Sequence, residues 1–179
     1  MSNTAGYTWA PSVHLLTKNK LYTSIRYNYE EAGAVSFLAG KTFEKTGTLN
    51  GFITPSAGLI AGTYYGVPFA VNCELEYNHL SFCSQAQYTM NTQAARNNFF
   101  YHWTDLSYRL LPWLDAGVAV QQTAYLVNQT VTNAGVMAEF ASGKWRIPVY
   151  YFNGGQFENY MVIGINMEWD IKNKTGKRN

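Results

Sequence analysis

From Tyr7 onward, apolar residues alternate with small or polar residues along nearly the whole chain. This period of two is typical of β-strands with two different faces, because successive side chains of a strand point to opposite sides. In the segment 21–30, Ile25 and Tyr27 share one face and Arg26 lies on the other. No segment of ten or more residues shows a helical stripe. The pattern predicts an all-β chain with strands near 8–16, 21–30, 34–44, 52–62, 67–77, 80–90, 99–110, 114–126, 133–141, 144–153 and 160–169.

Short turn signals separate these segments, among them Glu31-Ala32-Gly33, Asn78-His79 and Ser142-Gly143. Consecutive strands joined in this way form antiparallel hairpins, in which opposed residues share a face and have a constant index sum. The hairpins therefore predict specific cross-strand neighbours. The predicted pairs are Tyr77–Leu80 and Leu75–Phe82; Tyr29–Val35 and Tyr27–Phe37; Leu110–Leu114, Leu106–Val118 and Arg109–Asp115; and Phe140–Trp145, Ala138–Ile147 and Glu139–Arg146.

The composition excludes several classes of protein. Of the 179 residues, 47% are hydrophobic and only 13% are charged, whereas soluble domains carry about 25% charged residues. The length fits one domain. The longest apolar runs, such as 149–152, are far shorter than the roughly 20 residues of a membrane-spanning helix. The net charge of +2 gives no reason to expect a nucleic-acid partner.

The residue types on the polar face indicate which side of the sheet meets water. A soluble barrel would need many charges on its outer face, whereas an outer-membrane barrel turns its apolar face to lipid and encloses a polar lumen. Here the polar face is mostly small and uncharged, and aromatic residues gather towards the strand ends. We therefore expect an antiparallel up-and-down transmembrane β-barrel of about 10–12 strands, with a single barrel domain at 1–170 and a basic tail at 171–179.

This interpretation divides the candidate functional residues between two faces. The expected lumen-lining residues are His14, Arg26, Asn28, Glu30, Glu74, Glu76, Gln85, Gln87, Trp103, Asp105, Arg109, Asp115, Gln121, Glu139, Arg146 and Glu168. The expected lipid-facing residues are Tyr27, Tyr29, Phe37, Leu75, Phe82, Tyr88, Leu106, Val118, Phe140, Trp145, Ile147, Ile163 and Trp169.

Several stretches resemble a group of small, porin-like bacterial outer-membrane β-barrel proteins of uncharacterised function. The resemblance rests on residues 26–30, 84–88, 99–106, 121–123 and 150–153, and on their order and spacing. It implies a location in the bacterial outer membrane, with lipid or detergent as the partner. It also implies either a narrow pore or a structural barrel with a polar lumen. The chain departs from the family pattern by having uncharged residues in place of acidic ones at Ser24, Asn72, Gln85 and Gln87.

The residue types that carry chemistry show no catalytic or metal-binding pattern. The three histidines, His14, His79 and His102, lack metal-ligand spacing. A serine-hydrolase site would need His14 or His102 to meet a serine and a carboxylate across the barrel, and the sequence marks no particular serine. No catalytic residue, metal or cofactor is therefore expected.

The two cysteines, Cys73 and Cys83, fall on opposite faces of neighbouring strands, so two free thiols are expected. No apolar N-terminal stretch resembles a signal peptide, which suggests the mature form of an exported protein.

Two alternatives stay open at this point. One is a soluble β-barrel that holds a small hydrophobic ligand inside, with Tyr27, Phe37, Leu75 and Phe82 lining the cavity. The other is an outer-membrane barrel enzyme that modifies lipids.

Overall fold

The computed structural model describes residues 8–125, 130–154 and 159–169. These residues form one antiparallel sheet and a single turn of 3-10 helix, η1 (Ala95–Asn97). No helix in these ranges is long and apolar enough to cross a bilayer. The strands are β1 (Ser12–Leu16), β2 (Leu21–Tyr27), β3 (Ala34–Lys41), β4 (Phe43–Lys45), β5 (Asn50–Gly62), β6 (Gly66–Tyr77), β7 (Leu80–Asn91), β8 (Phe99–Leu111), β9 (Leu114–Tyr125), β10 (Thr130–Ser142), β11 (Trp145–Phe152), β12 (Tyr160–Ile163) and β13 (Asn166–Met167).

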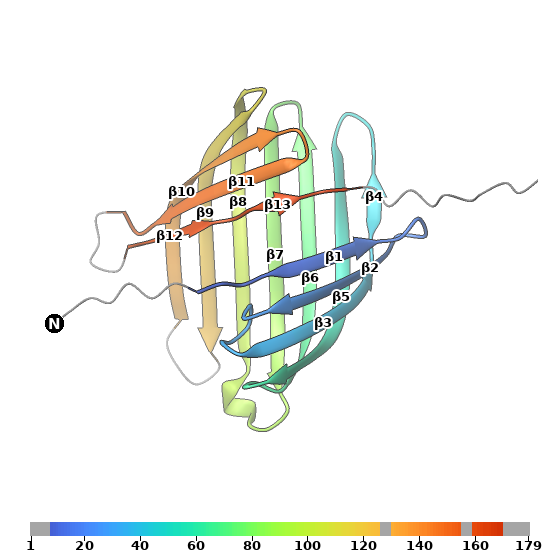
Figure 1. Cartoon of the computed structure of the whole chain (residues 1–179), viewed down its shortest axis with the longest axis vertical. Coiled ribbons are helices and arrows are strands. Elements are labelled where there is room, and N and C mark those ends of the chain that lie inside the picture. Colours follow the sequence, from blue (N-terminus) through green and yellow to red (C-terminus); the bar gives the residue numbers. More distant parts are fainter. Residues whose placement is uncertain (1–7, 126–129, 155–158, 170–179) are drawn as a thin grey trace, which may run out of the picture.

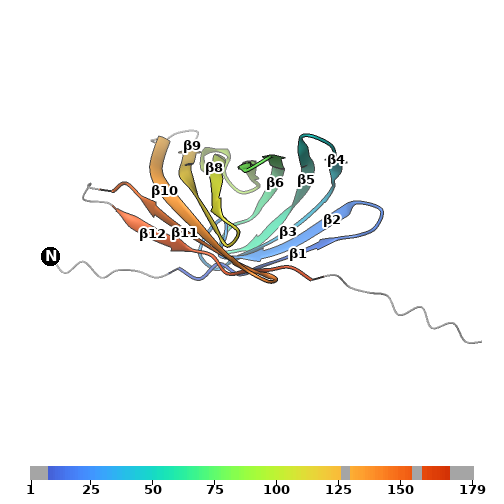
Figure 2. The same cartoon turned by 90° about the horizontal axis from the view of Figure 1, so that it is seen from above.

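The sheet is an antiparallel meander in which most strands pair with the next one along the chain, while the short strands β4 and β13 lie beside β5 and β11. Its order is β1-β2-β3-β5-β6-β7-β8-β9-β10-β11-β12. The sheet curls around a central space, so that β5 to β9 face β1 to β3, β11 and β12 (Figure 1, Figure 2). This confirms the predicted all-β, antiparallel up-and-down architecture.

Two predicted strands are each divided in two. The expected strand 34–44 becomes β3 and β4, which pair with β5 in one continuous register. The expected strand 160–169 becomes β12 and β13, both paired with β11. Pro148 of β11 lies at the second break. It accepts a hydrogen bond from the Gly164 N–H (2.8 Å) but has no N–H to return, so the ladder is interrupted there.

The hairpin registers agree with the sequence in two cases. Leu75 lies opposite Phe82 across β6 and β7, as predicted. Arg109 lies opposite Asp115 across β8 and β9, as predicted, and Leu106 lies opposite Val118. A bulge after Arg109 then places Leu111, rather than Leu110, opposite Leu114.

The other two hairpins differ from the prediction by two residues. Tyr27 lies opposite Val35, and Phe140 lies opposite Ile147. In both cases the cause is a turn residue with positive φ: Asn28 (55°) starts the β2–β3 turn, and Gly143 (61°) starts the β10–β11 turn. Because side chains alternate with a period of two, a shift of two residues leaves every side chain of the strand on its predicted face.

The distribution of polar and apolar side chains is the reverse of that in a soluble protein. Small and polar residues of the inner face are buried, among them Ser24, Ser36, Thr54, Gln87 and Thr89. Large apolar residues of the outer face are exposed on nearly every strand. A soluble protein hides such side chains from water and leaves its polar ones outside.

This sorting contradicts the alternative of a soluble barrel with an apolar cavity. Tyr27, Phe37 and Leu75 lie on the outer face with between 37% and 48% of their surface exposed. Phe82, which lies opposite Leu75, shares that face and is half-buried.

Candidate functional site

The lumen is crossed by a group of hydrogen-bonded polar side chains around Arg26, which we call the Arg26 bridge. The side chain of Arg26 is 5% exposed and forms an ion pair with Glu30. Its Nη2 donates to the Oε1 atom of Gln87 (2.8 Å), and its Nε donates to Ser36 Oγ (3.1 Å). Gln87 in turn donates to Thr89 Oγ1 (3.0 Å). Since β2 and β7 are separated in the sheet by β3, β5 and β6, this bridge links opposite walls.

The β2–β3 turn places Tyr29 inside the barrel. Its hydroxyl donates to Gln85 Oε1 (2.5 Å), and its ring makes an edge contact with Tyr101 (6.0 Å between centroids). The guanidinium of Arg26 lies 4.3 Å from the centre of the same ring. The expectation that Tyr29 faces lipid is therefore wrong.

Asn28 explains why Tyr29 points into the barrel. Strand β2 ends at Tyr27, and Asn28 adopts a left-handed φ of 55°, which ends the alternation of faces one residue before Tyr29. Asn28 was expected to line the lumen, but its side chain holds the turn. Its Oδ1 accepts from the Gly33 N–H (2.7 Å) and its Nδ2 donates to the Trp9 carbonyl (2.9 Å).

A second group of contacts crosses the lumen through aromatic rings. Trp103 of β8 packs edge-on against Tyr150 (4.8 Å) and Phe152 (5.2 Å) of β11. Phe152 stacks on Tyr160 of β12 (5.1 Å), whose hydroxyl donates to Gln121 of β9. Tyr150, Phe152 and Tyr160 were not among the residues expected to line the lumen. Parity could have found all three, because Tyr150 and Phe152 share a face with Arg146, and Tyr160 shares a face with Glu168.

Asp105 lies beside this aromatic group. Its Oδ1 atom accepts from Trp103 Nε1 (3.3 Å) and from the Tyr150 hydroxyl (3.4 Å).

The charged residues of the inner wall are largely paired. Arg109 Nε lies 3.1 Å from Asp115 Oδ1. Arg146 Nη1 lies 2.8 Å from Glu139 Oε1, and this pair forms diagonally because Glu139 lies opposite Pro148 in the ladder. A further pair that the sequence did not reveal joins Lys20 and Glu44 (2.5 Å).

Three acidic residues near one end of the lumen have no ion-pair partner in the described part of the chain: Glu74, Glu76 and Glu168. Glu74 interacts electrostatically with the other two, as well as with Glu139 and Arg146. These carboxylates form an acidic cluster on the inner wall, and Lys45 and Lys144 lie at the same end of the barrel.

The two histidines considered for catalysis lie on different faces. His14 lies on the inner face of β1, within hydrogen-bond distance of the Tyr22 hydroxyl (2.8 Å) and Ser12 Oγ (3.1 Å). His102 lies on the outer face, with Nε2 close to Thr104 Oγ1 (2.8 Å) and Ser84 Oγ (3.3 Å). Among the described residues, neither imidazole is hydrogen-bonded to a carboxylate, so no serine–histidine–acid site is assembled.

Both cysteines are free thiols, as predicted. Cys73 lies opposite Ser84 and Cys83 lies opposite Glu74, which places the thiols on opposite faces of the sheet.

Apart from Tyr29, the residues expected to face lipid lie on the outer face. Phe82 is half-buried. The others are between 37% and 61% exposed: Tyr27, Phe37, Leu75, Tyr88, Leu106, Val118, Phe140, Trp145, Ile147, Ile163 and Trp169.

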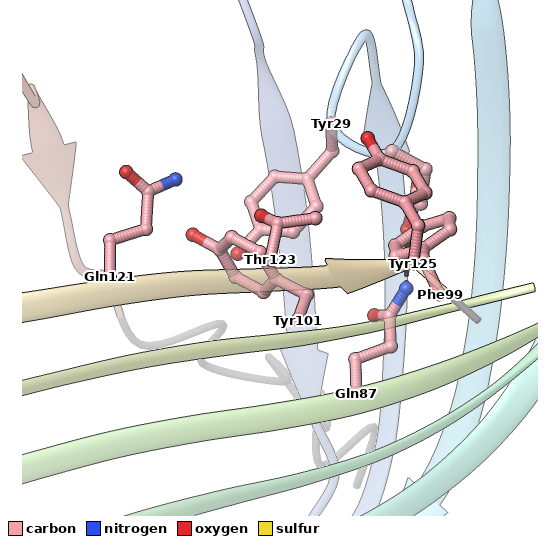
Figure 3. Close-up of a pocket in the computed structure, with 8 residues that line it drawn as sticks. Tyr29, Gln87, Phe99, Tyr101, Gln121, Thr123 and Tyr125 are labelled. Carbon is pink, nitrogen blue, oxygen red and sulfur yellow. Dashed lines mark hydrogen bonds between the residues drawn. The ribbon is translucent and has the colours of Figure 1, made fainter. Parts of the chain in front are cut away.

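A cavity of about 150 Å³ lies at the end of the lumen that holds the β2–β3 turn. Figure 3 shows Gln87, Tyr101 and Gln121 extending from neighbouring strands toward the region of Tyr29. The lining residues are Tyr29, Glu30, Gln87, Phe99, Tyr101, Gln121, Thr123 and Tyr125.

These features define an antiparallel up-and-down β-barrel of the porin type, with an apolar exterior and a polar lumen. A solved structure with this fold is the "KdgM porin in complex with disordered oligogalacturonate", which superposes on this chain with a TM-score of 0.65. The match covers 90% of this chain and 91% of the porin at 11% sequence identity, so the similarity concerns the fold. No protein-family model and no curated protein sequence matches the chain.

Proposed function

We propose that this chain is a β-barrel of the bacterial outer membrane and acts as a narrow pore for small ions and solutes. The observation that carries this proposal is the inside-out sorting of side chains. Large apolar residues are exposed around the outside, while Arg26, Gln87, Asp105 and Asp115 are buried inside. In a bilayer, lipid chains would cover the apolar surface, and the ladders between neighbouring strands satisfy the backbone polar groups that they join.

The strand lengths fit this location. Strand β6 has 12 residues, which at about 3.3 Å per residue extends over about 40 Å. A strand tilted by about 45° then covers about 28 Å along the membrane normal, close to the roughly 30 Å hydrocarbon core.

The contacts across the lumen support a narrow passage. The Arg26 bridge joins β2 to β7, and Trp103 with Tyr150 and Phe152 joins β8 to β11. Barrels of about eight strands are filled by their own side chains, whereas those of 16–18 strands leave an open channel. A barrel of intermediate size with two such bridges would admit small solutes only.

A second candidate function is a structural barrel with a closed lumen. The nearly complete burial of Arg26, Glu30 and Gln87 favours it, because such burial leaves no water-filled path beside these side chains.

Single-channel recording in planar bilayers distinguishes the two functions. We expect detergent-solubilised protein to produce small, uniform conductance steps. Insertion without conductance would favour the closed barrel. Protein that stays monomeric and soluble without detergent would overturn the membrane location itself.

A further inference from the structure

We propose that the cavity beside the β2–β3 turn is a binding subsite for a neutral, hydroxyl-bearing molecule the size of a small polyol or one sugar ring. This proposal rests on the pore function proposed above, because the ligand reaches the cavity through the lumen. It assigns the subsite to Gln121, Thr123 and the neighbouring aromatic residues.

The size of the cavity sets the size of the ligand. Its volume is about 150 Å³, whereas one water molecule occupies about 30 Å³ in the liquid. The space therefore holds about five waters or one compact polyol.

The lining offers both hydrogen-bond donors and acceptors. Gln121 contributes a carboxamide, and Thr123, Tyr101 and Tyr125 contribute hydroxyls. Each hydroxyl group of a polyol donates one hydrogen bond and accepts others, so this mixture complements it. Phe99 and the tyrosine rings supply apolar surface for the carbon skeleton.

Glu30 borders the cavity through its backbone, because its side chain is only 1% exposed. Its Oε1 accepts hydrogen bonds from Arg26 and from Gln87 Nε2 (3.4 Å). Its other oxygen, Oε2, is buried, so a molecule in the cavity does not reach it. The charged groups of Arg26 and Glu30 are therefore buried behind the lining.

The charge balance favours a neutral ligand. Glu30 is already neutralised by Arg26, whose Nε and Nη2 are used by Ser36, Gln87 and Glu30. A carboxylate-bearing ligand would lose its hydration in the cavity without gaining a free guanidinium, because Arg26 is buried and paired. A cation would gain little, because the Glu30 carboxylate is already paired with Arg26.

The turn holds the subsite ready for binding. The hydrogen bond from Tyr29 to Gln85 and the edge contact with Tyr101 fix the turn against the opposite wall. Tyr29 and Tyr101, which both line the cavity, are thereby positioned before a ligand arrives, which lowers the entropic cost of binding.

Titration calorimetry on detergent-solubilised protein tests the proposal, with glucose, its acid analogue glucuronate and KCl as probes. We expect millimolar binding of glucose, at least about tenfold weaker binding of glucuronate, and no saturable heat from KCl. Thr123→Val should weaken glucose binding about tenfold. The matched control is Thr132→Val, the same substitution at a residue that lies opposite Gln122 and outside the cavity.

Glu30→Gln provides a second variant, since it leaves Arg26 without its counter-charge. It should strengthen glucuronate binding and leave glucose binding nearly unchanged, because the Glu30 carboxylate does not reach the ligand, whereas Glu76→Gln at the other end of the lumen should change neither. Equal affinity for glucose and glucuronate, saturable cation binding, or glucose binding unaffected by Thr123→Val would overturn the subsite.

Failure of the subsite and failure of the pore function give different experimental results. Glucose binding in detergent without any conductance in bilayers would refute the pore and keep the subsite. Conductance without glucose binding would refute the subsite and keep the pore.

Discussion

At the scale of single residues, the backbone conformation of Asn28 decides what the lumen contains. Its left-handed φ directs Tyr29 and Glu30 inward, where strict alternation would have sent Tyr29 to the lipid. Asn tolerates this conformation better than most residues with a Cβ. The sequence could not reveal the effect, because an Asn in a turn fits several turn geometries.

The conformation of Asn28 is open to test by Asn28→Ala. We expect a loss of about 1–2 kcal/mol in the free energy of unfolding, because alanine is strained at positive φ and loses both side-chain hydrogen bonds. Conductance should rise, because Tyr29 and Glu30 are released from the lumen. Asn78→Ala is the control. Asn78 has a similar φ of 54° in the β6–β7 turn, so this variant should lower stability and leave conductance unchanged.

The Arg26 bridge makes a stronger prediction. Arg26→Ala leaves the buried Glu30 carboxylate without its partner, and breaking a buried pair costs about 3–5 kcal/mol. Denaturant unfolding in micelles should show this loss. Any protein that still folds should conduct more. Arg146→Ala breaks a pair whose arginine is 46% exposed, so its cost should stay within about 1 kcal/mol. Equal effects of the two substitutions would contradict the importance of burial.

At the scale of strands, alternation was sufficient for nearly all strand positions and for the face of most candidates. It could not fix register in two hairpins, because register depends on which turn residue takes positive φ. Gly143 and Asn28 are examples. It also missed the contacts of Trp103 with Tyr150 and Phe152, since a periodic pattern reports which face a residue occupies but not what lies across the lumen.

The break between β12 and β13 gives a prediction for a single strand. In Pro148→Val, the amide introduced at position 148 can donate to the carbonyl of Gly164 and complete the ladder. We expect slow hydrogen exchange at this new amide and stronger protection in β13. Exchange at the rate of an unstructured peptide would show that the proline is not the cause of the break.

At the scale of the whole molecule, the ion pairs of the described residues lie on the inner wall or near the ends of the strands. The arginines of the inner wall, Arg26, Arg109 and Arg146, are all paired. Glu74, Glu76 and Glu168 add negative charge near one end of the passage. Rings of acidic side chains favour cations in a narrow pore.

We therefore expect a potassium-to-chloride permeability ratio above one, measured as a reversal potential across a KCl gradient. The double change Glu74→Gln and Glu76→Gln should bring this ratio toward one. Glu31→Gln is the control, since Glu31 is exposed in the β2–β3 turn at the opposite end. A preference for chloride in the unaltered protein would refute this prediction.

The meander order also bears on how the chain assembles. Every ladder joins strands that are neighbours or next neighbours in sequence, so strands can add one at a time with short loops to close. The contacts between Arg26 and Gln87, and between Trp103 and Tyr150, instead join residues that are far apart along the chain. Because closing long loops costs more entropy, these contacts form late in folding. Trp103 fluorescence therefore offers a signal for the last stage, when the two walls meet.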